Sequence, residues 1–302
     1  LLLAEICLPF FNKIVDRDLQ VLTGETLLIV LSTLSLVLLT GFLAGIYPIG
    51  IKIAADYYQK TLQYSLGFLV GALVLGTAFP HGLKALNLSL PWQSIVWTTS
   101  ILAILGGLLI FSLKDGPFRK AASRFHVKSS LQVFKNKEFK AAAFGYAGHM
   151  WELYAFWVFV PVLLNTYLKI HPNEQLNLPL WSFTIIGIGS IACILSGYFS
   201  KIKGVLWTAK MNLSLSLLCC LFLPLVMYAS LPVFLAYLLF WGMVAIADSP
   251  LFSTLVAQKA PETLKGTALT IVSCLGFAVT IFSMQLLSEL SDCFESPVVF
   301  LI

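Results

Sequence analysis

The feature that most constrains this chain is a series of long apolar runs separated by short polar interruptions. Runs of roughly 20 residues match helices that cross a hydrocarbon core about 30 Å thick, whereas barrel strands would give ten-residue alternating segments. Only 11% of the 302 residues are charged, against about 25% in soluble domains. The sequence therefore predicts an all-α fold, a polytopic transmembrane helical bundle.

Counting the runs predicts eight complete membrane-spanning helices and two clipped ones. The complete helices are expected near residues 25–54, 61–83, 92–113, 141–166, 180–200, 205–229, 231–257 and 265–289. The clipped helices are expected at 1–12 and from 297 onward. Because an apolar run begins at Leu1 and another is interrupted at the end, we expect the sequence to be a fragment.

A basic segment at residues 114–140 is the longest polar interruption, with eight Lys or Arg residues against Asp115 and Glu138. Cytoplasmic loops carry an excess of Lys and Arg, so we expect this loop in the cytoplasm and the protein in an inner (plasma) membrane. Alternation from there places 15 of the 19 basic residues on the same side. The charges are interpreted as a solvated loop beside the lipid bilayer, and no nucleic-acid partner is expected.

The segment "AFGYAGHMWELYAFWVF", residues 143–159, places His149 and Glu152 one helical turn apart inside an apolar run. Ionisable groups at this depth are costly, and they usually face a cavity and serve transport. Burial opposes the charged form of each group whereas their mutual attraction favours it, so the pair is expected to exchange protons near neutral pH. Trp151 and Tyr154 flank this proposed pathway. The alternatives are a hydrogen-bonded pair that fixes the helix, or a permanently protonated carboxyl.

Asp248 is a second deep acid, and Pro250 two residues later is expected to bend its helix. Asp248 either lies on the pathway or caps the segment after the proline break. Tyr47 is a candidate solute contact, with helix packing and a proline kink as the alternative. The residues expected to allow close helix packing or bending are Gly41, Gly45, Pro48, Gly67, Gly71 and Pro250.

Enzymatic chemistry has no support in the sequence. The six cysteines include no CxxC pair and are interpreted as small apolar core residues. Neither HExxH nor GxSxG occurs, and no second histidine lies near Glu152. We therefore expect no metal, no cofactor and no catalytic residues.

Five segments together resemble transporters of the bacterial major facilitator superfamily: "GFLAGIYPIGIKIAADYY", "GFLVGALVLGTAFPH", "GHMWELYAFW", "ADSPLFSTLVAQKAP" and "LKGTALTIVSCLGFAVTIFSMQLL". The resemblance implies that residues 1–113 are a partial first half-bundle with family helices 3 to 6. It also implies that 114–140 is the central loop and that 141–302 is the second half-bundle, with helix 12 truncated. Helices 1 and 2 would be absent.

The same resemblance implies a secondary active transporter that works by alternating access between its halves. The chain departs from the family pattern at "GYFSKIKG", residues 197–204, where Lys201 and Ile202 replace the usual acid and arginine. The leading interpretation is a monomeric proton-coupled symporter for a small solute, such as an organic anion or another metabolite. The alternatives are a drug or metabolite efflux antiporter, favoured by the aromatic residues around Glu152, and a non-transporting membrane sensor or structural protein.

Overall fold

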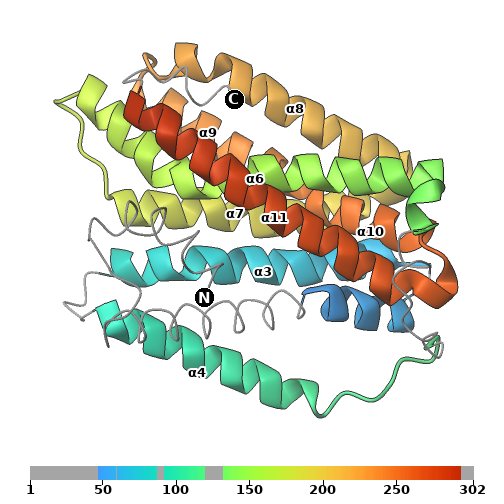
Figure 1. Ribbon diagram of the computed structural model, residues 1–302. Coiled ribbons are helices and arrows are strands. Elements are labelled where there is room, and N and C mark those ends of the chain that lie inside the picture. Colours follow the sequence, from blue (N-terminus) through green and yellow to red (C-terminus); the bar gives the residue numbers. More distant parts are fainter. Residues whose placement is uncertain (1–46, 59, 87–91, 120–131, 294–302) are drawn as a thin grey trace, which may run out of the picture. The chain divides into compact units, whose positions relative to one another are not determined.

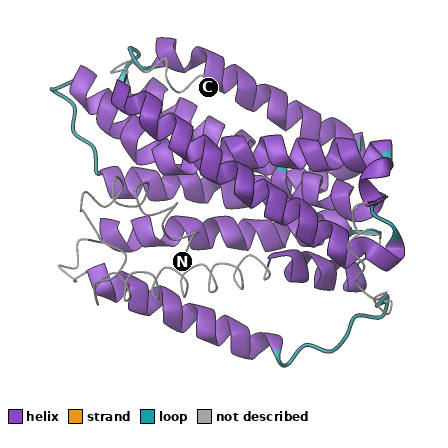
Figure 2. Ribbon diagram, viewed as in Figure 1, coloured by secondary structure: helices purple, strands orange, loops and turns teal. Residues whose placement is uncertain are grey.

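The computed structural model describes residues 47–58, 60–86, 92–119 and 132–293. The chain divides into two compact units, Leu1–Tyr47 and Pro48–Ile302, and the description below concerns the second. Within the described residues every regular element is a helix, and no strand occurs among them (Figure 2). The predicted helices at 1–12 and from 297, and most of the one at 25–54, lie outside the described residues.

The helices follow one another along the chain (Figure 1), and most connections are short, except the one between α4 and α6. Residues 48–57 are helical. The elements after them are α3 (Leu62–Ala85), α4 (Trp92–Ile110), η1 (Val133–Lys135), α6 (Lys137–Ile170), α7 (Leu178–Lys203), α8 (Val205–Val226), α9 (Leu231–Ala247), α10 (Ser249–Lys259), η2 (Glu262–Leu264) and α11 (Lys265–Cys293). Among the described residues, seven spans are long and apolar enough to cross a membrane, with α9 and α10 counted together as one. The predicted all-α transmembrane bundle is thus confirmed.

Helix α6 begins earlier than the apolar run that predicts it. The side-chain oxygen of Asn136 accepts hydrogen bonds from the backbone N–H groups of Glu138 at 2.9 Å and Phe139 at 3.2 Å. Such a cap satisfies donors that the first turn of a helix leaves free, so residues 137–140 of the basic segment are helical. With 34 residues, α6 is about 51 Å long and extends beyond the hydrocarbon core.

Two helices replace the single one predicted at 231–257, with Asp248 at their junction. Pro250 has no backbone N–H, so it cannot donate to the carbonyl of Ile246 four residues earlier. That carbonyl instead accepts from the N–H of Asp248 and from the thiol of Cys193 on α7, whose sulfur lies 3.5 Å away. The break is therefore held by a neighbouring helix.

The most extensive interface joins α3 and α7, which lie side by side (Figure 1). A Cβ atom on Gly67 would lie 2.9 Å from the carbonyl oxygen of Cys193, and one on Gly71 would lie 2.8 Å from that of Ser190. Backbone therefore meets backbone along this seam, as small residues permit in membrane helices. Helix α7 also packs on α9, and α6 packs on α11 and α10.

Candidate functional site

A buried histidine and a buried aspartate meet between α6 and the α9–α10 junction. Nδ1 of His149 lies 2.7 Å from Oδ1 of Asp248, and the two side chains are 0% and 2% exposed. The two atoms are close enough for an ion pair, but they are not aligned for a hydrogen bond. Nε2 of His149 also has no hydrogen-bond partner. Two buried polar groups that depend on each other in this way are costly to separate.

The first turn of α10 is capped by the backbone of Asp248, so the side chain of Asp248 is not needed as a cap. The backbone carbonyl of Asp248 accepts from the N–H groups of Leu251 at 3.0 Å and Phe252 at 2.9 Å, while its side chain makes no capping hydrogen bond. Of the two roles that the sequence leaves open, the side-chain cap is therefore not the one observed. The carboxylate is instead directed at His149.

A glycine allows α10 to come this close to α6. A Cβ atom on Gly145 would lie only 2.5 Å from Cε1 of Phe252, so any larger residue would collide with that ring. The Phe252 ring in turn lies beside the imidazole of His149, with centroids 6.0 Å apart. The small residue, the aromatic ring and the ion pair form one tightly packed contact.

Both partners lie well inside the spans that carry them, α6 and the span formed by α9 and α10. His149 is 12 residues from the start of α6 at Lys137, and Asp248 is 11 residues from the end of α10 at Lys259. At 1.5 Å per residue these separations are about 18 Å and about 17 Å. The two helix ends from which these lengths are counted lie next to each other, because Nζ of Lys259 lies 2.6 Å from Oε2 of Glu138. The pair thus lies well away from the ends of both spans.

Glu152, about 60° around α6 from His149, has different partners. The hydroxyl of Ser216 on α8 donates a hydrogen bond to Oε1 of Glu152. The indole N–H of Trp241 on α9 donates to the same hydroxyl oxygen at 2.9 Å. Three helices thereby meet at one carboxylate.

The structure adds to the pair expected from the sequence: His149 and Glu152 interact electrostatically, and each also has a partner on another helix. Residues three positions apart on a helix differ by about 60° in direction. His149 therefore points to α10, whereas Glu152 points to α8 and α9. The two groups belong to one polar region, but each has its own partner.

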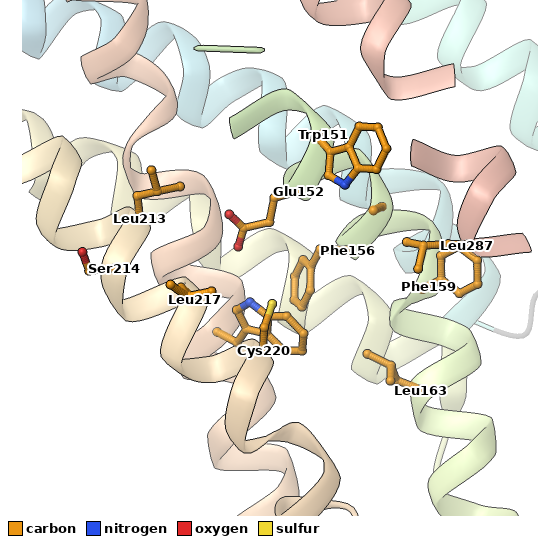
Figure 3. Close-up of a pocket in the computed structure, with 12 residues that line it drawn as sticks. Trp151, Glu152, Phe156, Phe159, Leu163, Leu213, Ser214, Leu217, Cys220 and Leu287 are labelled. Carbon is orange, nitrogen blue, oxygen red and sulfur yellow. The ribbon is translucent and has the colours of Figure 1, made fainter. Parts of the chain in front are cut away.

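A cavity of about 360 Å³ opens beside Glu152. Figure 3 shows the carboxylate reaching from α6 toward α8, where Leu213 and Leu217 lie. The lining residues come from α6, α8, α9 and α11, and most are apolar or aromatic. They are Trp151, Glu152, Ala155, Phe156, Phe159, Leu163, Leu213, Ser214, Leu217, Cys220, Trp241 and Leu287.

The other site residues predicted from the sequence lie at different places in the structure. Trp151 lines the cavity, whereas Tyr154 packs edge-on against Phe277 of α11, with ring centroids 5.8 Å apart. Pro250 occupies the first turn of α10. Tyr47 is the last residue of the first unit, and its contact with a solute stays a prediction. Gly41 and Gly45 lie outside the described residues.

Two residues of the site were not identified from the sequence, Ser216 and Trp241. Ser216 stands in the run "NLSLSLLCC", in which serines recur without any mark of function. Trp241 stands among apolar residues that any buried helix contains. Only the packing of α8 and α9 around α6 brings them to Glu152.

In the part of the chain that the structure describes, no three His, Cys, Asp or Glu side chains are grouped so as to hold a metal ion. The site offers instead a buried acid–base pair, a second carboxyl group and an adjoining apolar cavity. This combination suits binding and proton exchange.

Comparison with known proteins identifies the family. The model of the Major Facilitator Superfamily matches residues 19–284, which confirms the resemblance seen in the sequence. No curated protein and no solved structure matches the chain. Members of this family are transporters and not enzymes. The chain thus belongs to the Major Facilitator Superfamily, and it is a multi-pass membrane transporter.

Proposed function

We propose that this chain is a proton-coupled secondary active transporter that carries a small organic solute by alternating access. The observation that supports the proposal most is the set of three ionisable side chains, Glu152, His149 and Asp248, inside helices that must cross a bilayer. Groups placed at such depth mark proton and substrate pathways in membrane proteins.

The pair between α6 and α10 provides a way to couple a proton to movement. While His149 and Asp248 carry opposite charges, their attraction holds the α9–α10 junction against α6. A proton that binds the Asp248 carboxylate removes that attraction. The break at Pro250 gives α10 a point at which to move relative to α9.

Glu152 contributes the exchangeable proton on the solute side. Its carboxyl group lines the cavity, and the Ser216 hydroxyl can stabilise it in either protonation state, as donor to the carboxylate or as acceptor from the acid. A solute that enters the cavity therefore acts on this proton directly. We further propose a monomer in an inner membrane. The basic charge of residues 114–140 supports their placement in the cytoplasm.

The test uses the full-length protein in proteoliposomes with an imposed pH gradient and a pH-sensitive dye inside. A mixed library of metabolites is added to the wild type and to Glu152→Gln and Asp248→Asn. We expect solute-dependent proton movement in the wild type and its loss in both variants. Glu138→Gln is the matched control, because this glutamate lies on the same helix outside the site and the exposed ion pair that it makes with Lys259 contributes little to stability.

Two results would count against the proposal. If no metabolite pool moves protons in the wild type, proton coupling is wrong. If both buried-site variants match the wild type, the transporter uses other residues, and the three side chains are structural. A pool that is active only in the wild type and Glu138→Gln can be subdivided to identify the solute.

A further inference from the structure

The charge balance of the cavity beside Glu152 is one-sided. Glu152 is the one carboxylate that lines the cavity, and no Lys, Arg or His is among the described lining residues. His149, one turn away on α6, does not line the cavity and is paired with Asp248. When Glu152 is deprotonated, its negative charge faces a largely apolar cavity that has no cation in its wall, which is energetically costly.

While Glu152 is deprotonated, a chain of hydrogen bonds orients its carboxylate. An indole N–H can only donate, so the oxygen of Ser216 accepts from Trp241, and its single hydrogen is left to donate to Oε1 of Glu152. This chain engages Oε1 and leaves Oε2 outside it. Ser216 and Trp241 act as positioning residues that hold the carboxylate at the cavity wall.

The remaining wall is suited to an apolar body with a positive charge. Trp151, Phe156, Phe159 and Trp241 line the cavity, and the Phe156 and Trp241 rings lie with centroids 4.8 Å apart. Aromatic faces attract cations, most strongly where water is excluded. The volume of about 360 Å³ lies near the lower end of the range for small-molecule sites, roughly 300 to 1,000 Å³.

We propose that this cavity binds an organic cation with an apolar or aromatic body, a protonated amine or a quaternary ammonium, whose charged group contacts Glu152. Binding of the cation releases the proton from the Glu152 carboxyl group, so cation and proton exchange at one site. This inference rests on the proposed proton coupling and gives the class of solute. It replaces, for this cavity, the organic anion suggested by the sequence, because the carboxylate would repel an anion.

The test measures equilibrium binding to the purified full chain by calorimetry, with three probes of similar size and different charge. Benzyltrimethylammonium is the cation, 2-methyl-1-phenylpropan-2-ol is a near-isosteric neutral alcohol, and benzenesulfonate is the anion. We expect the cation to bind at least ten-fold more tightly than the alcohol and the anion not to bind. Titration in buffers of different ionisation enthalpy should show protons released as the cation binds.

Substitutions test whether the preference for the cation over the alcohol depends on Glu152. In Glu152→Gln the cation and the alcohol should bind within two-fold of each other, and in Ser216→Ala the preference should shrink, while Glu138→Gln keeps the wild-type preference. Ser214→Trp adds a bulky side chain at an exposed edge of the cavity, and it should abolish binding of every probe without lowering the unfolding temperature. This variant keeps the test decisive if Glu152→Gln fails to fold.

The proposal is overturned if the three probes bind equally, if the preference for the cation survives in Glu152→Gln, or if Ser214→Trp binds the cation normally. These outcomes are separate from those of the flux assay. Charge-selective binding without proton flux would refute proton coupling but leave the site in place. Proton-coupled flux without charge-selective binding would refute only the cavity's solute class.

Discussion

Gly145→Ala is the substitution that tests most directly whether packing maintains the buried ion pair. The added Cβ would lie 2.5 Å from Cε1 of Phe252, whereas carbon atoms in ordinary contact are about 3.5 to 4.0 Å apart. The Phe252 ring must therefore move by about 1 Å, and because this ring is buried we expect α10 to move with it. Because Asp248 precedes α10 directly, the movement should also lengthen its contact with His149.

The expected loss of stability follows from the change in the distance between His149 and Asp248. Lengthening the Nδ1–Oδ1 separation from 2.7 Å to about 3.7 Å lowers the Coulomb attraction from about 6 to about 4.5 kcal/mol at an effective dielectric constant of about 20. Overpacking costs about 1 to 3 kcal/mol more, and replacing glycine in a helix returns up to about 1 kcal/mol. We expect Gly145→Ala to lower the free energy of unfolding by about 2 to 3 kcal/mol.

Gly148→Ala is the matched control, since the same substitution on the same helix meets no heavy atom within 4 Å. It should raise the free energy of unfolding by about 0.5 to 1 kcal/mol, because glycine loses more backbone entropy than alanine when a helix forms. Unfolding of the purified full chain in detergent measures both changes, and the proteoliposome assay measures proton flux. Flux should fall in Gly145→Ala alone.

Adding Phe252→Leu to Gly145→Ala should restore part of the stability and flux, because the smaller side chain leaves room for the new methyl group. A double-mutant cycle isolates this coupling from the separate effects of the two substitutions. Equal stability of the two alanine variants would refute the reasoning. So would a complete absence of coupling between the substitutions at 145 and 252.

Two further predictions concern the helix interfaces away from the site. Gly67→Val should destabilise the α3–α7 seam, because a Cβ there would lie 2.9 Å from a backbone oxygen, whereas Gly76→Val on the same helix meets no atom within 4 Å. Unfolding measured in parallel should separate the two variants, and equal effects would show that the seam tolerates a side chain. Tyr167→Phe removes the hydrogen bond from the phenol to the carbonyl of Ala229 at 2.8 Å, at an expected cost of about 1 to 2 kcal/mol. Tyr228→Phe, at an exposed position, should change unfolding by less than about 0.5 kcal/mol, and a similar loss in both would contradict a specific role for the buried hydroxyl.

Helix boundaries show what hydropathy can and cannot predict. The apolar run that predicts a helix at 205–229 corresponds to α8, Val205–Val226. The agreement is close because the length of an apolar run reflects the thickness of the bilayer core. The start of α6 at Lys137 was missed, because the polar cap that begins this helix lies outside the apolar run. The break in the predicted helix 231–257 depends on Pro250, whose expected effect was a bend within a single helix.

The glycines also show what the sequence can and cannot predict. Spacing alone indicates that Gly67 and Gly71 favour close packing, but it does not name the helix that they contact. The structure places both against the backbone of α7. Sequence periodicity defines a face of a helix, whereas its partner is decided by the arrangement of all the helices together.

By itself the sequence determined that this protein is a helical membrane transporter, because length and hydropathy of the runs are set by the bilayer, and the motifs are local. It also singled out His149, Glu152 and Asp248, since ionisable groups in apolar runs are rare. Only the tertiary structure decided their partners: His149 with Asp248, and Glu152 with Ser216 and Trp241. The physical reason is that ion pairs and hydrogen bonds act over about 3 Å, and these residues come from helices that are far apart in the sequence and meet only when the bundle packs.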